Sequence, residues 1–237
     1  MKCLKFRLRG RTAFFKRAEF NSHTYFTYNN IHKPALLGML GAIAGYGGYA
    51  QQKKDDKYPE YYAVLKDIKV SIVPISENGG VFTKKIQTFN NSVGYASNEE
   101  GGNLVVREQW LENPCWDIYI ADDNSQGYLN VEKHIMGGRA EFIPYLGKND
   151  HTALIENPCI IDVEPSDSEE IDSIVIDNDF DASECFGDYI FIEYVPVAMD
   201  GVYNHAIYKK SVYTDGEYNR EHIGSVYKGD GRNLYFY

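Results

Sequence analysis

The chain has 237 residues, of which 43% are hydrophobic, so it can form one large domain or two small ones with a substantial core. Its four cysteines lie far apart and show no CxxC or Cys/His ligand spacing, which argues against a zinc site and against a disulfide framework. We therefore expect no metal, no cofactor and a cytoplasmic setting. No apolar run reaches the roughly 20 residues that a membrane helix needs, and no signal-peptide cleavage site is evident, so no membrane contact is expected.

The formal net charge of −10 conceals an uneven distribution along the chain. The first 33 residues contain a single acid, Glu19, and eight cations, which are Lys2, Lys5, Arg7, Arg9, Arg11, Lys16, Arg17 and Lys33. Residues 151–200 contain fourteen acids and neither Lys nor Arg. The N-terminal part is therefore suited to a polyanion, and the acidic part is expected to face solvent or a basic partner.

Residues 2–9 (KCLKFRLR) alternate between apolar and basic side chains, a pattern that predicts a strand with one apolar and one basic face. An exposed strand with solvated cations is an equally good interpretation. Residues 10–33 follow as a long loop in which cations alternate with aromatic side chains. Such groups can pair with phosphates and stack on bases, which makes this loop a candidate RNA-binding segment.

Residues 29–50 predict a helix that begins at Pro34, with Asn30 or His32 as the capping residue, and extends over 34–50. Its glycines recur at spacings of three and four residues, which indicates that another backbone or a ligand lies close to the helix surface. The free N–H groups of its first turn, beside His32 and Lys33, are arranged in outline like a phosphate-binding site. A buried helix whose glycines pack against a sheet is the alternative.

Residues 62–75 are predicted to form a strand, and 78–80 a turn. Residues 81–110 are polar, rich in β-forming residues and interrupted by SNEEGGN at 97–103, a pattern that predicts a long projecting hairpin. Further strands are expected at 115–121, 160–163, 174–176, 188–197, 206–214 and 234–237, with a short helix at 129–136. This order indicates an α+β fold, and the change in charge suggests one domain at 1–155 and an acidic, strand-rich region at 156–237.

Four runs together resemble the Cas5 family of CRISPR-associated proteins, most closely its type I-B form. They are KCLKFRLRG with AFFK after it, IHKPALLGMLGAIAGY, WLENPCWDIYI and IPYLGKNDHTALI, and they cover most of residues 1–160 in the family's order. The resemblance implies a ferredoxin-like βαββαβ domain, similar to RNA-recognition modules (RRM-like), with a hairpin thumb at about 81–110. It also implies a place in the Cascade complex between the Cas8 large subunit and the first Cas7 backbone subunit.

In that place the protein would hold the 5′ handle of CRISPR RNA without cutting it, and would reach target DNA only through the complex. The predicted RNA-binding set is Arg9, Arg11, Lys16, Arg17, Asn21, Ser22, Tyr25, His32, Lys33, Lys84, Lys85, Gln87, Arg107, Gln109, Arg139 and Lys148. The run Gly137-Gly138-Arg139 is either a backbone anion site or a plain turn.

Two other classes of function remain open at this level. A type I-C relative cuts precursor RNA without metal, and the corresponding chemistry here would use Lys133, His134 and Tyr46. The third class is a binding module whose basic strand serves a protein partner, and it is distinguished from RNA binding by a weak response to salt.

Overall fold

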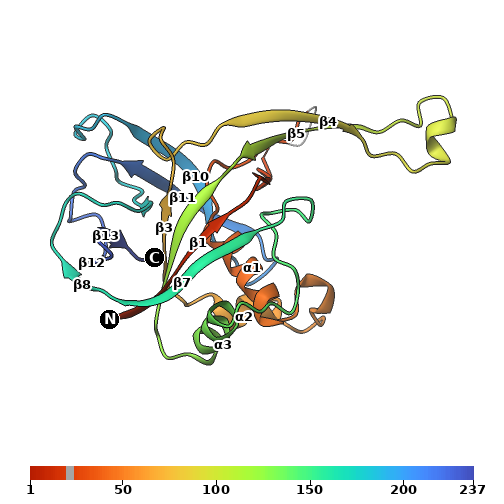
Figure 1. Ribbon diagram of the computed structural model, residues 1–237. Helices are drawn as coiled ribbons and strands as arrows, with labels where there is room; N and C mark the ends of the chain where they lie inside the picture. Colours follow the sequence, from red (N-terminus) through yellow and green to blue (C-terminus); the bar gives the residue numbers. More distant parts are fainter. Residues whose placement is uncertain (20–23) are drawn as a thin grey trace.

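A four-stranded antiparallel sheet forms the centre of the protein in the computed structural model, which describes residues 1–19 and 24–237. Its order is β3-β6-β1-β7, with bounds Val70–Pro74, Cys115–Ala121, Lys2–Arg9 and Leu154–Asp162 (Figure 1). The predicted strands at 2–9 and 115–121 are confirmed. Asn21 and Ser22 lie outside the described residues.

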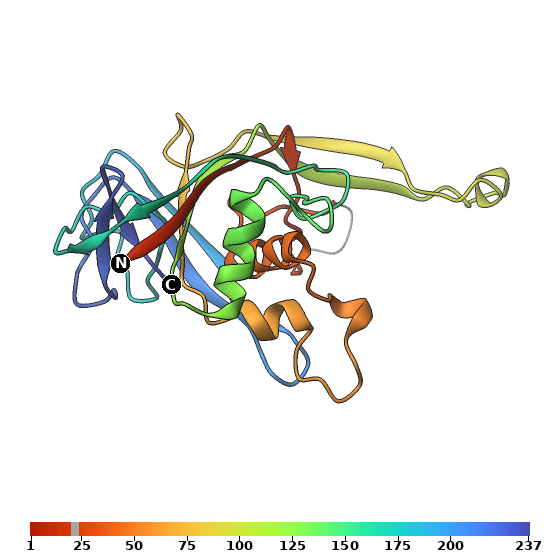
Figure 2. The ribbon, with the colours of Figure 1, turned by 60° about the horizontal axis from the view of Figure 1, so that its bottom comes forward.

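In the described residues, these strands are connected by three α-helices: α1 (Lys33–Ala44), α2 (Glu60–Leu65) and α3 (Gln126–Met136). Figure 2 shows α1 and α3 on the same side of the sheet. His32 caps α1 because its side chain accepts a hydrogen bond from the backbone N–H of Ala35, and Ser125 caps α3 in the same way. Along the sequence, the central elements thus run strand, helix, strand, strand, helix, strand, with α2 added before β3.

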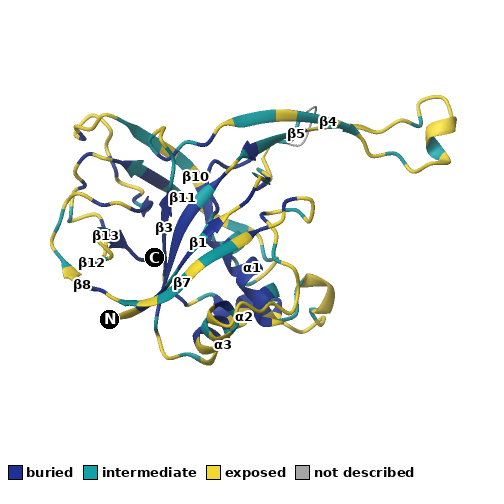
Figure 3. Ribbon diagram, in the orientation of Figure 1, coloured by how far each residue is buried: buried dark blue, intermediate teal, exposed yellow. Residues whose placement is uncertain are grey.

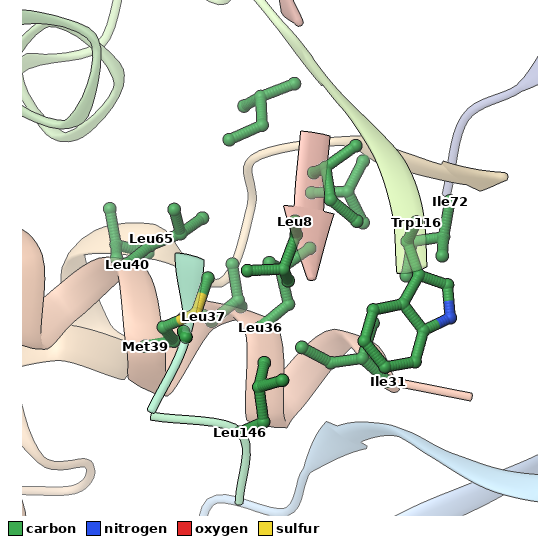
Figure 4. Packing of buried hydrophobic residues seen from close by; sticks show 14 of the residues in the cluster. Leu8, Ile31, Leu36, Leu37, Met39, Leu40, Leu65, Ile72, Trp116 and Leu146 are labelled. Carbon is green, nitrogen blue, oxygen red and sulfur yellow. The ribbon is translucent and has the colours of Figure 1, made fainter. Parts of the chain in front are cut away.

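The main hydrophobic core lies between this sheet and the helices (Figure 4). Leu4, Phe6 and Leu8 point from β1 into it, as the alternating pattern predicts, and all three are fully buried. Leu36, Leu37 and Leu40 meet them from α1, while Trp116 closes the core from β6.

The opposite face of the sheet is covered by the C-terminal end of the chain. A small sheet of order β13-β12-β8 lies there, formed by Arg232–Tyr235, Val226–Gly229 and Glu164–Ser166. Leu234 and Phe236 pack against Cys3, Val73 and Tyr119 of the central sheet. The central sheet is therefore buried on both faces at this end.

A second three-stranded sheet completes the C-terminal part, in the order β10-β11-β9. Its strands are Ile190–Met199, Ala206–Thr214 and Val175–Ile176, close to the predicted ranges. Val195 and Met199 of β10 belong to the same core as α1, so this sheet is packed on the helical side of the central one.

The predicted long hairpin is present and projects from the body (Figures 1 and 2). It consists of β4 (Lys84–Asn90) and β5 (Val105–Glu112), and β2 (Thr12–Ala13) pairs with the base of β5. Its tip, 91–104, includes the short 3₁₀ turn Ala96–Asn98 and is mostly exposed (Figure 3). A segment that buries so little on its own is suited to contact with a partner.

Three predictions about element boundaries are wrong. The helix expected at 34–50 ends at Ala44, because Gly45 adopts a left-handed conformation with φ of 82° and caps the helix. The strand expected at 62–75 is divided into α2 and β3, since Pro59 starts a helix whose buried residues are Tyr61, Tyr62 and Leu65. The boundary expected at 155 falls inside β7, which pairs with β1 from Leu154 to Asp162.

Candidate nucleic-acid interface

The projecting hairpin has two chemically different faces. Directly paired residues of an antiparallel ladder point to the same side, so the register assigns each side chain to a face. One face, here called the Arg107 face, carries Lys84, Ile86, Thr88, Asn90, Val105, Arg107, Gln109 and, buried at the base, Leu111. It contains no acid, and Arg107 is exposed. Lys84 lies half-buried at the base of the hairpin. Burial lowers the pKa of its ammonium group, and the nearby Glu193 only partly offsets this effect, so the pKa is lowered overall.

The other face, here called the Tyr25 face, carries both charges. Its strand residues are Lys85, Gln87, Phe89, Val106, Glu108, Trp110 and Glu112, and the bridge between Tyr25 and Glu108 brings Tyr25 alongside them. Lys85 pairs with Glu112 at 3.2 Å, and the indole N–H of Trp110 donates to Glu108 at 2.8 Å. The predicted cations of the hairpin are thus separated: Lys84 and Arg107 share a face whose strand residues include no acid, whereas Lys85 lies on the face that carries Glu108 and Glu112 and pairs with Glu112.

Lys148 is held against the Tyr25 face by ion pairs and an aromatic contact. Its ammonium lies 3.3 Å from Glu108 and 3.2 Å from Asp150, and it sits over the Phe89 ring at 4.9 Å from the centroid. Burial lowers its pKa, but these two carboxylates raise it more, so the net shift is upward. The predicted RNA contact of Lys148 therefore competes with two existing ion pairs.

The run 144–151 fixes the base of the hairpin. Leu146 is fully buried, and its carbonyl accepts a hydrogen bond from Phe14 N–H at 3.1 Å. Gly147 has a φ of 86°, and a Cβ there would lie 2.0 Å from the Phe14 carbonyl oxygen, so only glycine fits. His151 contacts Trp110 edge-to-face at 4.6 Å and shares a 2.6 Å hydrogen bond with the hydroxyl of Thr12. This run acts structurally, and it holds the thumb on the body.

Two of the predicted N-terminal cations lie beside acids of the C-terminal part that are far from them in the sequence, Glu156 and Glu193. Arg9 forms a two-pronged pair with Glu156, with distances of 2.9 and 2.6 Å. Arg17 pairs with Glu19 and lies 3.5 Å from Glu193, whose carboxylate also accepts from the backbone N–H of Asn29. The acidic window therefore does not turn entirely away from the basic loop, as the sequence suggested, but neutralises part of it.

The remaining described cations of this loop have different surroundings. Arg11 is exposed beside β2. Lys16 is exposed and lies over the Tyr25 ring at 3.9 Å from its centroid, a cation–π contact that fixes both side chains near the base of the hairpin.

The N-terminal end of α1 is covered, which argues against the predicted handle contact at His32 and Lys33. Burial lowers the pKa of His32 to about 3, and its imidazole is occupied in capping the helix between Tyr28 and Phe15. Lys33 is 9% exposed, and its ammonium donates to the carbonyl of Tyr237 at 3.1 Å. Burial also lowers the pKa of Lys33, to about 8. The helix end is a packed junction with the C-terminal residues.

The alternative catalytic residues are not assembled around a common point. His134 shares a hydrogen bond through Nδ1 with the Asn130 carbonyl at 2.8 Å, and its Nε2 lies 3.7 Å from Glu141. Lys133 is exposed at the adjacent helical position, and neighbours in a helix do not face one another. Tyr46 packs against the core, and no hydrogen bond or ion pair joins these three described residues. Arg139 is exposed and, with His134, lines a largely apolar cavity of about 320 Å³.

Sequence reasoning missed a buried charged network on the second face of the central sheet. Asp117, whose side chain is 2% exposed, accepts from Arg7 at 2.8 and 3.0 Å and from Arg232 at 2.8 Å. Burial raises the pKa of Asp117, but the two guanidinium groups lower it by more than burial raises it, so the pKa is lowered overall. An acid in the middle of the apolar strand CWDIYIA was a signal for a buried cationic partner.

Within the described part of the chain, no group of three or more His, Cys, Asp or Glu side chains is placed to hold a metal ion. In the same residues, no helix combines the length and the apolar character required for a membrane span.

Residues 3–115 match the sequence model of the family described as CRISPR-associated protein (Cas_Cas5). Two solved structures share the fold of nearly the whole chain. One is a chain of a CRISPR RNA-guided surveillance complex, with 10% identity, coverage of 93% of both chains and a TM-score of 0.52. The other is a CRISPR protein from Archaeoglobus fulgidus, with 11% identity, coverage of 99% of this chain and 98% of that one, and a TM-score of 0.53.

No curated protein matches the chain. Residues 3–115 therefore carry the sequence pattern of the Cas5 family, and the fold of the whole chain is one found in CRISPR proteins.

Proposed function

We propose that the chain is a Cas5-family subunit of a type I-B-like Cascade complex, and that it binds the 5′ handle of CRISPR RNA through the Arg107 face of its thumb. The family match over residues 3–115 supports the assignment, and so does the fold shared with a chain of an RNA-guided surveillance complex. The antiparallel strand order β3-β6-β1-β7, with α1 and α3 as its connections, supports a ferredoxin-like βαββαβ domain at its centre.

The asymmetry of charge across the hairpin carries the proposal. Arg107 and Lys84 lie on a face whose strand residues include no acid, beside the amide of Gln109 and the hydroxyl of Thr88, and Glu193 approaches only Lys84, at the base of the hairpin. Cations bind phosphates, and the amide and hydroxyl can hydrogen-bond to splayed bases and 2′-hydroxyls. The opposite face is a poorer surface for RNA because Glu108, Glu112 and Asp150 surround its lysines.

In this proposal the subunit works in the cytoplasm, beside a Cas7 backbone subunit and the Cas8 large subunit, and meets target DNA only through the complex. We further propose that it does not cut RNA, because Lys133, His134 and Tyr46 are not arranged to deprotonate a 2′-hydroxyl together. Incubating the purified chain with labelled repeat RNA tests this point. Cleavage that His134→Ala abolishes would refute the non-catalytic role.

Adjacent lysines on opposite faces allow a matched test of the RNA interface. Binding of the fluorescently labelled 5′ handle of the locus's own repeat is measured by anisotropy over a range of salt concentrations. We expect Arg107→Ala and Lys84→Ala to weaken binding several-fold and each to reduce the slope of log affinity against log salt by about 0.7, the loss of one phosphate contact on a single strand. Lys85→Ala, on the Tyr25 face, is the control and should change affinity less.

Equal losses for Lys84→Ala and Lys85→Ala would contradict the assignment to one face. Binding that does not respond to salt would favour a protein-binding module instead.

A further inference from the structure

An acidic pocket lies in the C-terminal region, and none of its lining residues belongs to the hairpin. It has a volume of about 250 Å³ and is lined by Glu169, Asp177, Phe180, Asp181, Glu184, Cys185, Glu217, Tyr218, Asn219 and His222. This is smaller than the roughly 300–1,000 Å³ of typical small-molecule sites. Five carboxylates would repel a nucleic acid, so the pocket suits one small cationic group.

Asp177 gives the pocket an unsatisfied acceptor. The residue is 2% exposed, and its Oδ1 accepts from the backbone N–H of Asp179 at 2.9 Å. Its Oδ2 is buried without a hydrogen-bond partner, and the imidazole Nδ1 of His222 lies 4.0 Å away, beyond hydrogen-bond distance. Leaving a buried carboxylate oxygen unpaired is costly, which points to a donor that binds there.

The chain's own strong cations do not fill this role. The Lys210 ammonium donates to the carbonyl of Phe180 at 3.0 Å, and a guanidinium nitrogen of Arg220 lies 3.4 Å from the carbonyl of Ser166. Among the described residues, no Lys or Arg forms an ion pair with any of the five pocket acids. Lys210 acts on Asp181 only without a direct ion pair, so most of the negative charge of the pocket is left for an external partner.

The walls favour a guanidinium group on a long side chain. Phe180 and Tyr218 are both largely buried and pack with ring centroids 5.8 Å apart, which gives an apolar wall for an alkyl stem and an aromatic surface for a planar cation. A divalent metal fits less well, because the described residues provide no cluster of ligands with metal-binding geometry. We propose that this pocket receives an arginine side chain of a partner protein.

The test uses the full chain and capped arginine (N-acetyl-L-arginine methylamide), followed by amide chemical shifts in NMR spectra. We expect saturable shifts around Asn178 and Gly216, no such shifts with capped citrulline, which has the same shape without the charge, and about tenfold weaker binding in Asp177→Asn. Asp188→Asn removes an exposed acid outside the pocket and should bind normally.

If Asp177→Asn does not fold, the exposed rim variants Glu184→Gln and Glu217→Gln replace it, and each should weaken binding. Absence of saturable binding would overturn the proposal. Tighter binding of spermidine than of capped arginine would assign the pocket to a free polyamine, and tight binding of Ca²⁺ would assign it to a metal; either result refutes the arginine site. None of these outcomes depends on RNA binding, so they leave the thumb proposal to its own test.

Discussion

Several charged or titratable side chains that the sequence offers for binding are engaged in internal contacts instead. His32 and Lys33 look from the sequence like a phosphate-binding helix end, yet one caps α1 and the other donates to the Tyr237 carbonyl. Arg7 and Arg232 hold Asp117, and Arg9 holds Glu156. Those acids lie more than a hundred positions from their partners, so no local pattern reveals the pairs.

His32 should make the protein sensitive to acid. Its pKa is about 3 in the folded state, against 6.5 ordinarily, so between these values the unfolded chain binds more protons and stability falls as the pH falls. His32→Asn keeps a good capping residue without a titratable ring. We expect the slope of unfolding free energy against pH, measured by urea denaturation between pH 4 and 7, to decrease by at most about 1.4 kcal/mol per pH unit.

An unaltered slope in His32→Asn would mean that the imidazole is protonated in the folded state.

Asp117 should contribute far more to stability than an exposed acid of similar geometry. Asp117→Asn leaves two partly buried guanidinium groups without a counter-charge, and we expect a loss of about 3 kcal/mol in unfolding free energy. Glu156→Gln, which removes the exposed partner of Arg9, should cost less than about 1 kcal/mol. Because the Asp117 pKa is lowered, the difference from wild type should shrink as the pH drops below the ordinary carboxyl range. Similar losses for both variants at pH 7 would contradict this ranking.

At the level of elements, the sequence predicts those whose signal is local. The alternation of 2–9 identifies β1, the turn residues around SNEEGGN identify the hairpin, and Pro34 marks the start of α1. Helix α2 escapes notice because Tyr61, Tyr62 and Val64 favour strands, and its packing on α1 decides the outcome. Which hairpin face carries Arg107 depends on register, which a sequence alone leaves undetermined.

Two glycines of α1 allow a test of how α1 packs on α2, because alanine substitutions at the two positions should change the stability in opposite directions. A Cβ on Gly41 would lie 2.4 Å from the Cβ of Tyr61, whereas a Cβ on Gly38 would reach Tyr61 only at 3.8 Å, an ordinary contact. Gly41→Ala should therefore destabilise the protein by about 1–3 kcal/mol. Gly38→Ala should stabilise it by up to about 1 kcal/mol through helix propensity. The unfolding free energies of the two variants are measured by urea denaturation. Stabilisation by both substitutions would show that α2 can shift to make room for a Cβ at position 41 at little cost.

At the scale of the whole molecule, the predicted division at residue 155 cuts through one folding unit. Strand β7 pairs with β1 across that position, and Leu234 and Phe236 cover the second face of the same sheet. The change in charge near residue 155 therefore concerns the surface residues, whereas the residues on both sides of this position share one core. The sequence therefore reveals the change in charge, while the strand pairing of β7 with β1 places its residues in the central sheet.

Separate expression of residues 1–155 and 156–237 should consequently give two chains that fail to fold. We expect neither fragment to show a cooperative thermal transition by circular dichroism, while the full chain shows one. A subtler form of the same test is Phe236→Ala, which should make the buried thiol of Cys3 react faster with a thiol reagent under native conditions. Cooperative unfolding of fragment 1–155 would restore the two-domain interpretation.

The contact of Lys33 with Tyr237 and the cover that Phe236 gives to β1 also have a consequence for biosynthesis. During translation the first strand leaves the ribosome long before the residues that complete its surroundings. Until residues 232–237 emerge, the apolar side chains of Cys3, Val73 and Tyr119 remain open to water and to other chains. The second face of the central sheet therefore stays open until residues 232–237 have been made, and until then this apolar surface is exposed to aggregation.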